Sequence, residues 1–319
     1  MRVLLTGGTG FVGSHTIPAL LARGHAPRLL VRDEGRASAT LDRHGVDPAS
    51  VDVVVGDVLD RRSVDDAVQG CDAVIHAAAA IGITGPGGGS THDQNVGGTR
   101  SVVEAGLAEG CDPVVHVSSV AVFIPPTDPV ITAASRLAEP RNDYGRSKVA
   151  AERWVRARQD EGAPITVVYP GGVIGPDQPR LDATMEGIAA ARRTAWPSAP
   201  GGVGLIDVRD LAVALAAAIV PGRGARRLVL GGTYLTWPAL GDLTDELCGT
   251  KARRLPLPRP VLVGAGTALD VIRRVVDLPY PLTRDAAEIM ATMVATDGGR
   301  ALGALGVSFR RGEEGLSAG

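Results

Sequence analysis

The chain has 319 residues, of which 45% are hydrophobic and 21% are charged, and its formal net charge is −2 at pH 7. This length suits one large domain or two modest ones, and the nearly even charge balance gives no electrostatic basis for binding nucleic acid. The three cysteines are far apart and match no disulfide or metal-binding spacing, so we expect reduced thiols and no metal site.

The chain shows no pattern typical of a targeting or membrane-spanning segment. A strand-like pattern begins at its second residue, which leaves no room for a signal peptide. The longest largely apolar stretch, residues 260–269, is far shorter than the ~20 residues that a membrane span needs. We therefore expect a cytoplasmic protein with no membrane span.

The first predicted elements are a strand and a helix joined by a glycine-rich turn. Residues 6–13 read TGGTGFVG, and they follow an apolar run and precede an apolar-periodic segment. The glycines allow a tight turn, a close approach of the backbone to a pyrophosphate, and close packing of the helix on the strand. The free N–H groups at the helix start would then face the phosphates. This context favours dinucleotide binding over a plain glycine turn.

The second strand is predicted at residues 28–32, and the residues at its end select the cofactor. An acid there would bind the ribose 2′-hydroxyl of NAD, whereas an arginine would accommodate the 2′-phosphate of NADP. Arg32 ends the strand and Asp33 follows it. Because a guanidinium can fork onto a phosphate, we favour NADP(H) over NAD(H). NAD(H) is the alternative if Asp33 acts as the acid.

The third strand is predicted at residues 51–55, with a helix after it at residues 61–69. Asp57 and Val58 lie between the two. There they suit an adenine pocket, in which the acid accepts from the exocyclic amine and the valine packs on the ring. The alternative interpretation of the pair is a helix-capping turn.

The fourth strand is predicted at residues 73–76 and leads into four alanines. Such small residues leave room for a cofactor, and they would equally serve close packing. His76 is interpreted as a hydrogen-bonded structural histidine. Residues 81–93 are glycine-rich and predicted to be irregular, and their place after a parallel strand suits a substrate flap. A helix is predicted next, at residues 95–107.

The fifth strand is predicted at residues 113–117 and ends in Ser118 and Ser119. Residues 124–142 are punctuated by prolines and predicted to be irregular. A helix then runs from residue 143 to about residue 159 and carries Tyr144 and Lys148. Because these two residues are four apart, they project from one helical face. The alternative interpretation is an ordinary surface pair, which has the same spacing.

The remaining elements continue the alternation of strands and helices. A sixth strand is predicted at residues 165–169, a helix at residues 211–219 and a last strand at residues 227–230. The segment at residues 251–259 is interpreted as a solvated connection. The C-terminal tail is helical in pattern, and its expected N-cap residues are Thr236, Thr283 and Asp297.

Strands alternating with helices predict an α/β fold with a doubly wound parallel Rossmann sheet. Nearly every motif described above lies at the carboxyl end of a predicted strand or at the start of the following helix. Ligands bind at that edge of such sheets. The smaller, mostly helical C-terminal part is predicted to form a substrate domain.

Together these motifs resemble the extended short-chain dehydrogenase/reductases of the NAD(P)-dependent epimerase/dehydratase superfamily. In family order they are TGGTGFVG (6–13), DV (57–58), HAAA (76–79), NVGGT (95–99), SS (118–119), YGRSK (144–148) and PGGVIGP (170–176). DGGRALGALG at residues 297–306 also resembles the closing helix of the family. Residues 31–33 (VRD) resemble the dihydroflavonol 4-reductase-like branch, which uses NADPH.

The resemblance implies that Tyr144 is the general acid/base and that Ser119 holds the substrate oxygen. Lys148 would bind the nicotinamide ribose and support Tyr144, and Asn95 would complete the catalytic set or order the cofactor site. A tyrosine in water loses its proton near pH ~10. An ammonium about 4 Å from a phenolate, at an effective dielectric of about 20, favours ionisation by about 4 kcal/mol.

The residues expected at the cofactor are Gly7, Thr9, Gly10, Phe11, Val12, Gly13, Arg32, Asp57, Val58, Ala77, Ala78, Ala79, Tyr144, Lys148, Pro170, Gly171 and Val173. The resemblance implies a dinucleotide-binding domain at residues 1–174 and 203–232. It implies a discontinuous substrate domain at residues 175–202 and 233–319, and a homodimer formed through two helices of each subunit.

The expected activity is hydride transfer between the nicotinamide and a small-molecule carbonyl or secondary alcohol. Phe123 and Ile124 stand where the family commonly has Tyr-Gly, which indicates an apolar pocket. One alternative is an NAD-dependent nucleotide-sugar epimerase or dehydratase, although Val31 replaces the acid expected of it. A steroid-type hydroxy dehydrogenase/isomerase is another, with residues 260–276 as an apolar lid. A non-catalytic dinucleotide sensor is the alternative outside the enzymes.

Overall fold

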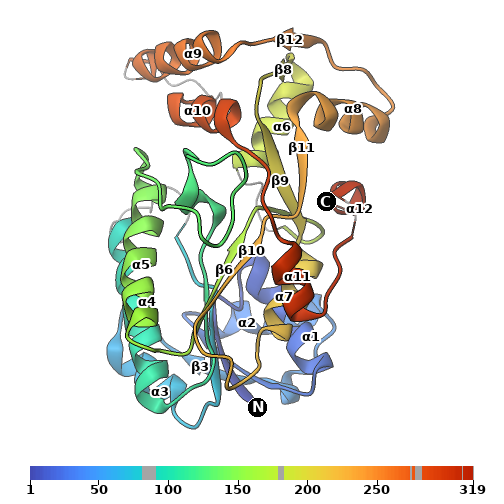
Figure 1. The fold of residues 1–319 in the computed structure, drawn as a ribbon. Coiled ribbons are helices and arrows are strands. Elements are labelled where there is room, and N and C mark those ends of the chain that lie inside the picture. Colours follow the sequence, from blue (N-terminus) through green and yellow to red (C-terminus); the bar gives the residue numbers. More distant parts are fainter. Residues whose placement is uncertain (81–90, 179–182, 274, 277–281, 311, 319) are drawn as a thin grey trace.

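A computed structural model describes residues 1–80, 91–178, 183–273, 275–276, 282–310 and 312–318 (Figure 1). A parallel sheet lies between two layers of helices, and a smaller part, rich in helices, sits beyond the carboxyl ends of the strands. The predicted fold class is thereby confirmed. No helix in the described ranges combines the length and the hydropathy that crossing a membrane requires.

The main sheet has seven strands in the order β10-β6-β5-β4-β1-β2-β3, and all of its neighbouring pairs are parallel. Its strands are β1 (Arg2–Thr6), β2 (Ala26–Val31), β3 (Asp52–Val55), β4 (Ala73–His76), β5 (Val114–Val117), β6 (Ile165–Pro170) and β10 (Arg226–Leu230). The strand order reverses between β1 and β4. In sheets of this kind, the crevice for a dinucleotide opens at that reversal.

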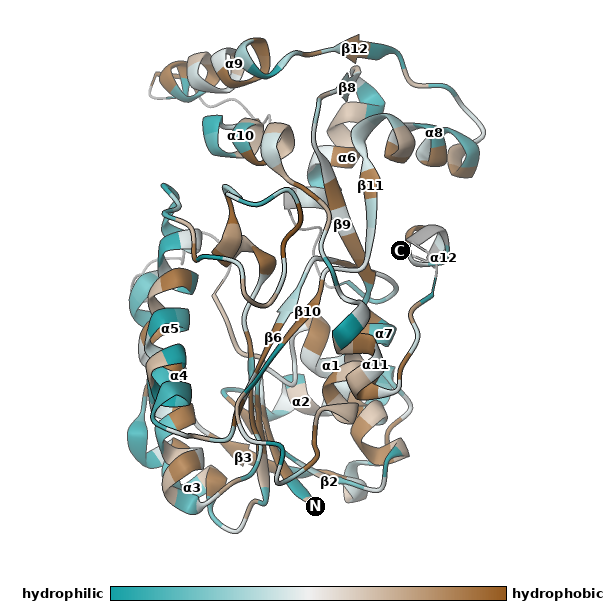
Figure 2. Ribbon diagram, viewed as in Figure 1, coloured by the Kyte–Doolittle hydropathy of each residue, from teal (hydrophilic) through white to brown (hydrophobic). Residues whose placement is uncertain are grey.

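Alternation along the strands builds a separate apolar core on each face of the sheet. In β1, Val3 and Leu5 pack into one core and Leu4 packs into the other. Figure 2 shows the strands as largely hydrophobic, as expected for a sheet that is covered on both faces. One helical layer consists of α3 (Arg61–Val68), α4 (Thr91–Glu109) and α5 (Asp143–Asp160). The other consists of α1 (Phe11–Ala22), α2 (Glu34–Arg43), α7 (Val208–Ala217) and α11 (Gly299–Leu305).

The smaller part is built from segments that are distant in sequence. A three-stranded sheet has the order β11 (Thr233–Thr236), β9 (Gly202–Asp207), β7 (Gly172–Ile174). A two-stranded sheet joins β8 (Trp196–Ser198) to β12 (Arg254–Pro256). The accompanying helices are α6 (Ala183–Arg193), α8 (Trp237–Cys248), α9 (Arg259–Ile272), α10 (Arg284–Thr292) and α12 (Gly312–Ala318).

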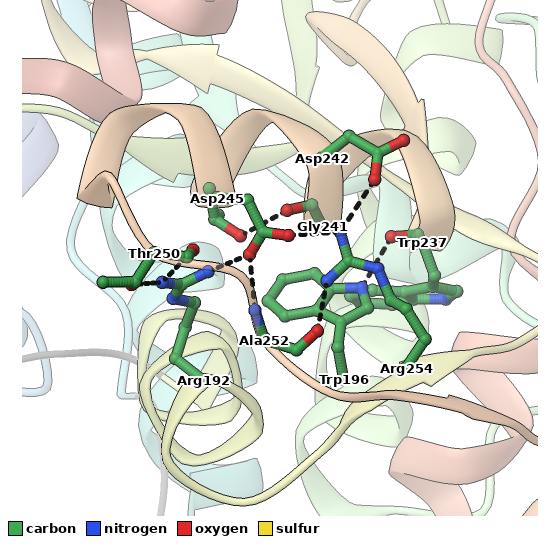
Figure 3. A network of polar contacts seen from close by, with 10 residues as sticks. Arg192, Trp196, Trp237, Gly241, Asp242, Asp245, Thr250, Ala252 and Arg254 are labelled. Carbon is green, nitrogen blue, oxygen red and sulfur yellow. Dashed lines mark hydrogen bonds and ion pairs between the residues drawn. The ribbon is translucent and has the colours of Figure 1, made fainter.

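A polar network fixes α6 and β12 against α8 (Figure 3). The carboxylate of Asp245 accepts from the guanidinium groups of Arg192 and Arg254, and also from the backbone N–H of Ala252. The indole of Trp196 donates to the carbonyl oxygen of Trp237 over 2.7 Å. Most of residues 251–259 are exposed, as predicted for a solvated connection, and these contacts fix the short strand β12 within them.

Most predicted elements are confirmed, and the differences have local causes. The helix expected at residues 95–107 begins earlier, at Thr91, so only residues 81–90 of the predicted flap are left, and these lie outside the described part of the chain. Thr236 and Thr283 cap their helices as predicted. The third N-cap is Gly298 rather than Asp297, although the carboxylate of Asp297 still accepts from the backbone N–H of Gly299.

Candidate active site

The glycine-rich turn between β1 and α1 is as closely packed as its sequence predicts. Gly7 has a φ of 76°, and a Cβ there would lie 2.7 Å from the backbone nitrogen of Ala78. A Cβ on Gly13 would lie 2.1 Å from the carbonyl oxygen of Gly7. Only glycine fits either position, so the turn holds the start of α1 directly against the end of β1.

The start of α1 is suited to a phosphate. Its N-cap, Gly10, offers no side-chain acceptor to the N–H groups of the first turn, which includes Phe11 and Val12. Such a helix end has donors and a partial positive charge available for an anion. Thr9 is half-buried beside it. The geometry therefore fits the pyrophosphate of a dinucleotide.

The end of β4 lies beside this turn. A Cβ on Gly7 would also lie 2.9 Å from the carbonyl oxygen of Ala77, so the two backbones are in contact. Ala79 is exposed, and Ala78 is half-buried with its N–H directed at the Thr6 hydroxyl (3.4 Å). The structure thus brings these alanines to the dinucleotide turn.

His76 has the structural role predicted for it. Its ring nitrogens lie 2.8 Å and 3.3 Å from the hydroxyls of Thr6 and Thr99. Burial lowers the pKa of its imidazole to about 3, with a smaller contribution from the charge of Lys148. The ring is therefore neutral at physiological pH.

At the end of β2, the arginine and the acid have different surroundings. Arg32 is exposed immediately after the strand. Asp33 is the N-cap of α2, and its carboxylate accepts from the backbone N–H of Arg36 over 3.0 Å. Asp33 is therefore already engaged in a local structural role. Arg36 was not predicted as a cofactor residue, and its exposed guanidinium lies one helical turn further on, 4.0 Å from the carboxylate of Asp33.

At the end of β3, the capping turn that was weighed as an alternative is present. The carboxylate of Asp57 accepts from the N–H of Leu59 over 2.9 Å, and Asp60 caps α3. Val58 is half-buried and packs toward Gly98 of α4, where a Cβ would lie 3.0 Å from the valine methyl. An adenine pocket formed by Asp57 and Val58 stays a prediction.

Tyr144 and Lys148 lie on the first turns of α5, a helix that Asn142 caps. The ammonium of Lys148 is 5.9 Å from the centroid of the Tyr144 ring and 3.4 Å from the carbonyl oxygen of Val117, which ends β5. Lys148 is only 5% exposed. Burial lowers its pKa to about 8, and the negative charge of Glu152 opposes that shift.

Ser119 stands two residues beyond Val117, at the same strand end. It is half-buried, and its hydroxyl oxygen accepts from the N–H of Ala121 over 3.1 Å to cap a short 3₁₀ helix, η2 (Val120–Phe123). Ser118 is buried, and its hydroxyl has no partner among the described residues. The structure thus gathers Ser119, Tyr144 and Lys148 at the carboxyl end of β5.

Asn95 is nearby but fully engaged. Its amide oxygen accepts from the N–H of Ala80 (2.8 Å), and its amide nitrogen donates to the Ala80 carbonyl (3.1 Å) and to the Ser147 hydroxyl (2.9 Å). The side chain is 3% exposed. This arrangement orders the end of β4 against α5, which agrees with the ordering role that the sequence left open.

Pro170 and Gly171 lie where β6 passes into β7. A Cβ on Gly171 would lie 2.3 Å from the carbonyl oxygen of Gly231, so the chain has no room for a side chain there. Val173 is half-buried in β7 against the core on the α1 side of the sheet. Pro170 is the last residue of β6, and Gly171 and Val173 follow it on the same edge as the other motifs.

Phe123 and Ile124, which replace the Tyr-Gly pair common in the family, differ in burial. Phe123 is 1% exposed and packs on Tyr169, with the ring centroids 5.0 Å apart. It belongs to the core between the sheet and α5. Ile124 is only partly buried. The more apolar pocket inferred from this pair stays a prediction.

A buried polar cluster beneath Lys148 was not predicted. Glu152 is 0% exposed, and one oxygen of its carboxylate accepts from the hydroxyl of Tyr169 (2.5 Å) and from Arg156 (2.8 Å). The other oxygen has no partner among the described residues. Glu152 follows Lys148 by four residues on the same helical face, which is the spacing that could have identified it.

Comparisons with known proteins agree with this geometry. A model of the NAD dependent epimerase/dehydratase family matches residues 3–231. Sterol demethylase protein B of Methylococcus capsulatus is 30% identical over 281 residues, which cover 86% of this chain and 83% of that protein. A putative dihydroflavonol 4-reductase of a Synechocystis strain is 30% identical over 72% of this chain and 66% of its own length.

Among solved structures, the UDP-glucose 4-epimerase of Bifidobacterium longum in complex with NAD+ and UDP has the same fold. It superposes with a TM-score of 0.72 at 18% sequence identity, and the match covers 100% of this chain and 96% of that one.

Proposed function

The chain belongs to the NAD dependent epimerase/dehydratase family, and on that premise we propose that it is an NADP(H)-dependent oxidoreductase acting on a small, apolar carbonyl compound or secondary alcohol. The chain is an enzyme of the extended short-chain dehydrogenase/reductase type, as its motifs indicated. The similarity to a putative dihydroflavonol 4-reductase agrees with the branch that residues 31–33 resemble.

One observation supports the proposal most directly: the ammonium of Lys148 lies near both the Tyr144 ring and the end of the strand that leads to Ser119. Its distances are 5.9 Å to the ring centroid and 3.4 Å to the Val117 carbonyl oxygen. A protein that only bound a dinucleotide would have no need for a buried ammonium beside a phenol at this edge.

The nicotinamide, when bound, would supply or accept the hydride. The chain's own residues would manage the proton and the oxygen. Tyr144 would give its proton to the carbonyl oxygen in reduction and take it back from the alcohol in oxidation. Ser119 would donate a hydrogen bond to the same oxygen. Lys148 is cationic below a pH of about 8, and its charge would favour the phenolate form of Tyr144.

The surroundings of β2 support NADP(H) as the cofactor. Arg32 is exposed at the strand end, and Arg36 presents a second exposed guanidinium one turn into α2. The carboxylate of Asp33 accepts a hydrogen bond at the start of α2, and the guanidinium of Arg36 lies beside it. The positive charge of Arg36 would offset the repulsion between this carboxylate and a 2′-phosphate. A bidentate guanidinium–phosphate contact is the arrangement that favours a 2′-phosphate over a hydroxyl.

One relative indicates the class of substrate. Sterol demethylase protein B aligns over most of this chain, and its name refers to a sterol. We propose a hydrophobic alcohol or ketone of that general kind, bound by residues 175–202 and 233–319, while residues 1–174 and 203–232 bind the dinucleotide. We also propose that the chain forms a homodimer.

The test is to incubate the purified full chain with NADPH and a panel of aldehydes, ketones, sterols and hydroxysteroids, in both reaction directions. We expect loss of the nicotinamide absorbance with at least one apolar substrate, and a preference for NADPH over NADH. Tyr144→Phe should abolish turnover and leave NADPH binding intact, because the phenol acts on the proton and not on the dinucleotide.

Three outcomes would contradict the proposal. Turnover by Tyr144→Phe within tenfold of the wild type would give Tyr144 another role. Tight NADPH binding without turnover of any substrate would indicate a sensor. Copurified NAD+ with interconversion of sugar nucleotides, and no net redox change, would indicate an epimerase.

A further inference from the structure

Away from the proposed active site, three side chains that can bind metals converge from distant parts of the sequence. They are His15 on α1, His44 directly after α2, and Asp177 in the turn that follows β7. One ligand-capable atom from each lies within 4.8 Å of those of the other two. Their positions, 15, 44 and 177, form no motif, and no metal site was predicted.

The two imidazoles are arranged as metal ligands are. The Nδ1 atom of His15 lies 3.0 Å from the carbonyl oxygen of Phe11, and a carbonyl can only accept. Nδ1 therefore carries the proton, and the lone pair is on Nε2. Histidines that bind metals commonly donate their other ring N–H to a backbone carbonyl in this way, which fixes the tautomer and the ring orientation.

His44 provides the second imidazole. The centroids of its ring and of the His15 ring are 4.6 Å apart, and the rings are inclined by 74°. The Nε2 atom of His44 is buried and has no hydrogen-bond partner within the described part of the chain. A buried ring nitrogen without a protein partner is available to a metal ion, which binds the neutral form of an imidazole.

Asp177 supplies the anionic group on the open side. It is exposed and has a φ of 60°, in the left-handed region where non-glycine residues are uncommon. One of its carboxylate oxygens lies within 4.8 Å of the ligand-capable atoms of both histidines. Two ligand atoms that each lie ~2 Å from one ion are at most ~4 Å apart. Side-chain rotations that move the ligand atoms by about 1 Å would therefore complete the site.

We propose that His15, His44 and Asp177 bind a first-row divalent transition-metal ion, with Zn²⁺ as its representative. Two neutral imidazoles and one carboxylate are the donor set of many zinc sites that keep an open coordination position, whereas Mg²⁺ and Ca²⁺ prefer all-oxygen ligands. The ion would join the dinucleotide helix α1 and the end of α2 to the turn after β7. This site is separate from Ser119, Tyr144 and Lys148.

The test is calorimetric titration of the full chain, stripped of metal by a chelator, with Zn²⁺ alone. We expect one equivalent to bind and the unfolding temperature to rise with Zn²⁺ concentration. Co²⁺ should give a visible absorption band, whereas Mg²⁺ should not bind. His44→Gln and Asp177→Asn should each weaken Zn²⁺ binding at least about tenfold, as expected for the loss of a ligand.

His25→Gln is the matched control, because His25 is a partly exposed histidine outside the cluster, and it should leave Zn²⁺ binding unchanged. Asp177→Asn alters only an exposed turn, so its result stands even if His44→Gln fails to fold. Failure of the wild type to bind Zn²⁺ would overturn the proposal. So would equal Zn²⁺ affinity of the wild type and Asp177→Asn, or a loss of binding in His25→Gln as large as that in the cluster variants.

Discussion

The side-chain amide of Asn95 donates to the hydroxyl of Ser147 over 2.9 Å, and that hydroxyl donates in turn to the carbonyl oxygen of Tyr144 over 2.7 Å. A buried residue of α4 thereby determines where the first turn of α5 lies. The same amide makes two hydrogen bonds to the backbone of Ala80. Asn95 therefore connects the end of β4 to the helix that carries Tyr144 and Lys148.

This link makes Asn95 a positioning residue with a measurable effect. Asn95→Ala leaves the buried backbone groups of Ala80 without their partner, so we expect unfolding free energy to fall by about 1–3 kcal/mol. The factor by which kcat falls should be larger than the factor by which the KM for NADPH changes. Urea denaturation and steady-state kinetics measure the two effects.

Ser147→Ala is the companion variant, because it removes only the connection to α5. If the connection positions Tyr144, the two substitutions should be non-additive in kcat, since both break one chain of hydrogen bonds. Strictly additive effects on kcat would show that Asn95 acts through Ala80 alone.

The buried ammonium of Lys148 should make the stability of the protein depend on pH. Its pKa is 10.5 in the unfolded chain and about 8 in the folded protein. Between these values the unfolded chain binds more protons than the native protein, so the free energy of unfolding rises with pH. Relative to Lys148→Met, the wild type should therefore gain on the order of 3 kcal/mol at most between pH 8 and 10.5.

Denaturation of both proteins in guanidinium chloride across that pH range measures the difference. Glu152→Gln removes the negative charge that opposes the shift, so the rise should begin at a lower pH. Tyr169→Phe, which keeps the charge of Glu152, is the control and should leave the onset in place. A wild-type curve parallel to that of Lys148→Met would mean that Lys148 titrates normally.

Two helical glycines make a matched test of the dinucleotide turn. In Gly13→Ala the new Cβ would lie 2.1 Å from the carbonyl oxygen of Gly7, which must move and take the turn with it. We expect a loss of about 1–3 kcal/mol in stability and the loss of measurable NADPH binding. Fluorescence titration with NADPH and thermal unfolding provide the readouts.

Gly187→Ala is the control, because a Cβ there meets no heavy atom within 4 Å. It should leave NADPH binding intact and stabilise α6 by up to about 1 kcal/mol. NADPH binding by Gly13→Ala at wild-type affinity would show that the turn can rearrange and that its close packing is not required.

The choice of cofactor should depend on Arg32. Arg32→Ala removes a charge-assisted contact to the 2′-phosphate, worth about 1.5–3 kcal/mol, so the KM for NADPH should rise roughly tenfold or more. The KM for NADH should not change. Arg23→Ala, another exposed arginine, is the control for general loss of positive charge. Equal changes for NADPH and NADH would remove Arg32 from the 2′-phosphate site.

The sequence alone predicted the doubly wound sheet and the position of its ligand edge, because both depend on local patterns. Apolar runs, glycines and helix caps are specified within a few residues of each other, and the spacing of Tyr144 and Lys148 fixes their common helical face. The early start of α4 at Thr91 was missed because residues 91–95 are all polar, so the apolar periodicity of the helix begins only at Val96.

The tertiary structure decided the roles of residues whose partners are distant in the chain. The carboxylate of Asp33 caps α2, whereas Arg32 beside it is exposed and has no such role in the helix. Phe123 packs against Tyr169 of β6, a contact that no local pattern specifies. His15, His44 and Asp177 meet only because α1, α2 and the turn after β7 converge. Local patterns determine elements and their chemistry, whereas packing between distant elements determines which side chains share a site.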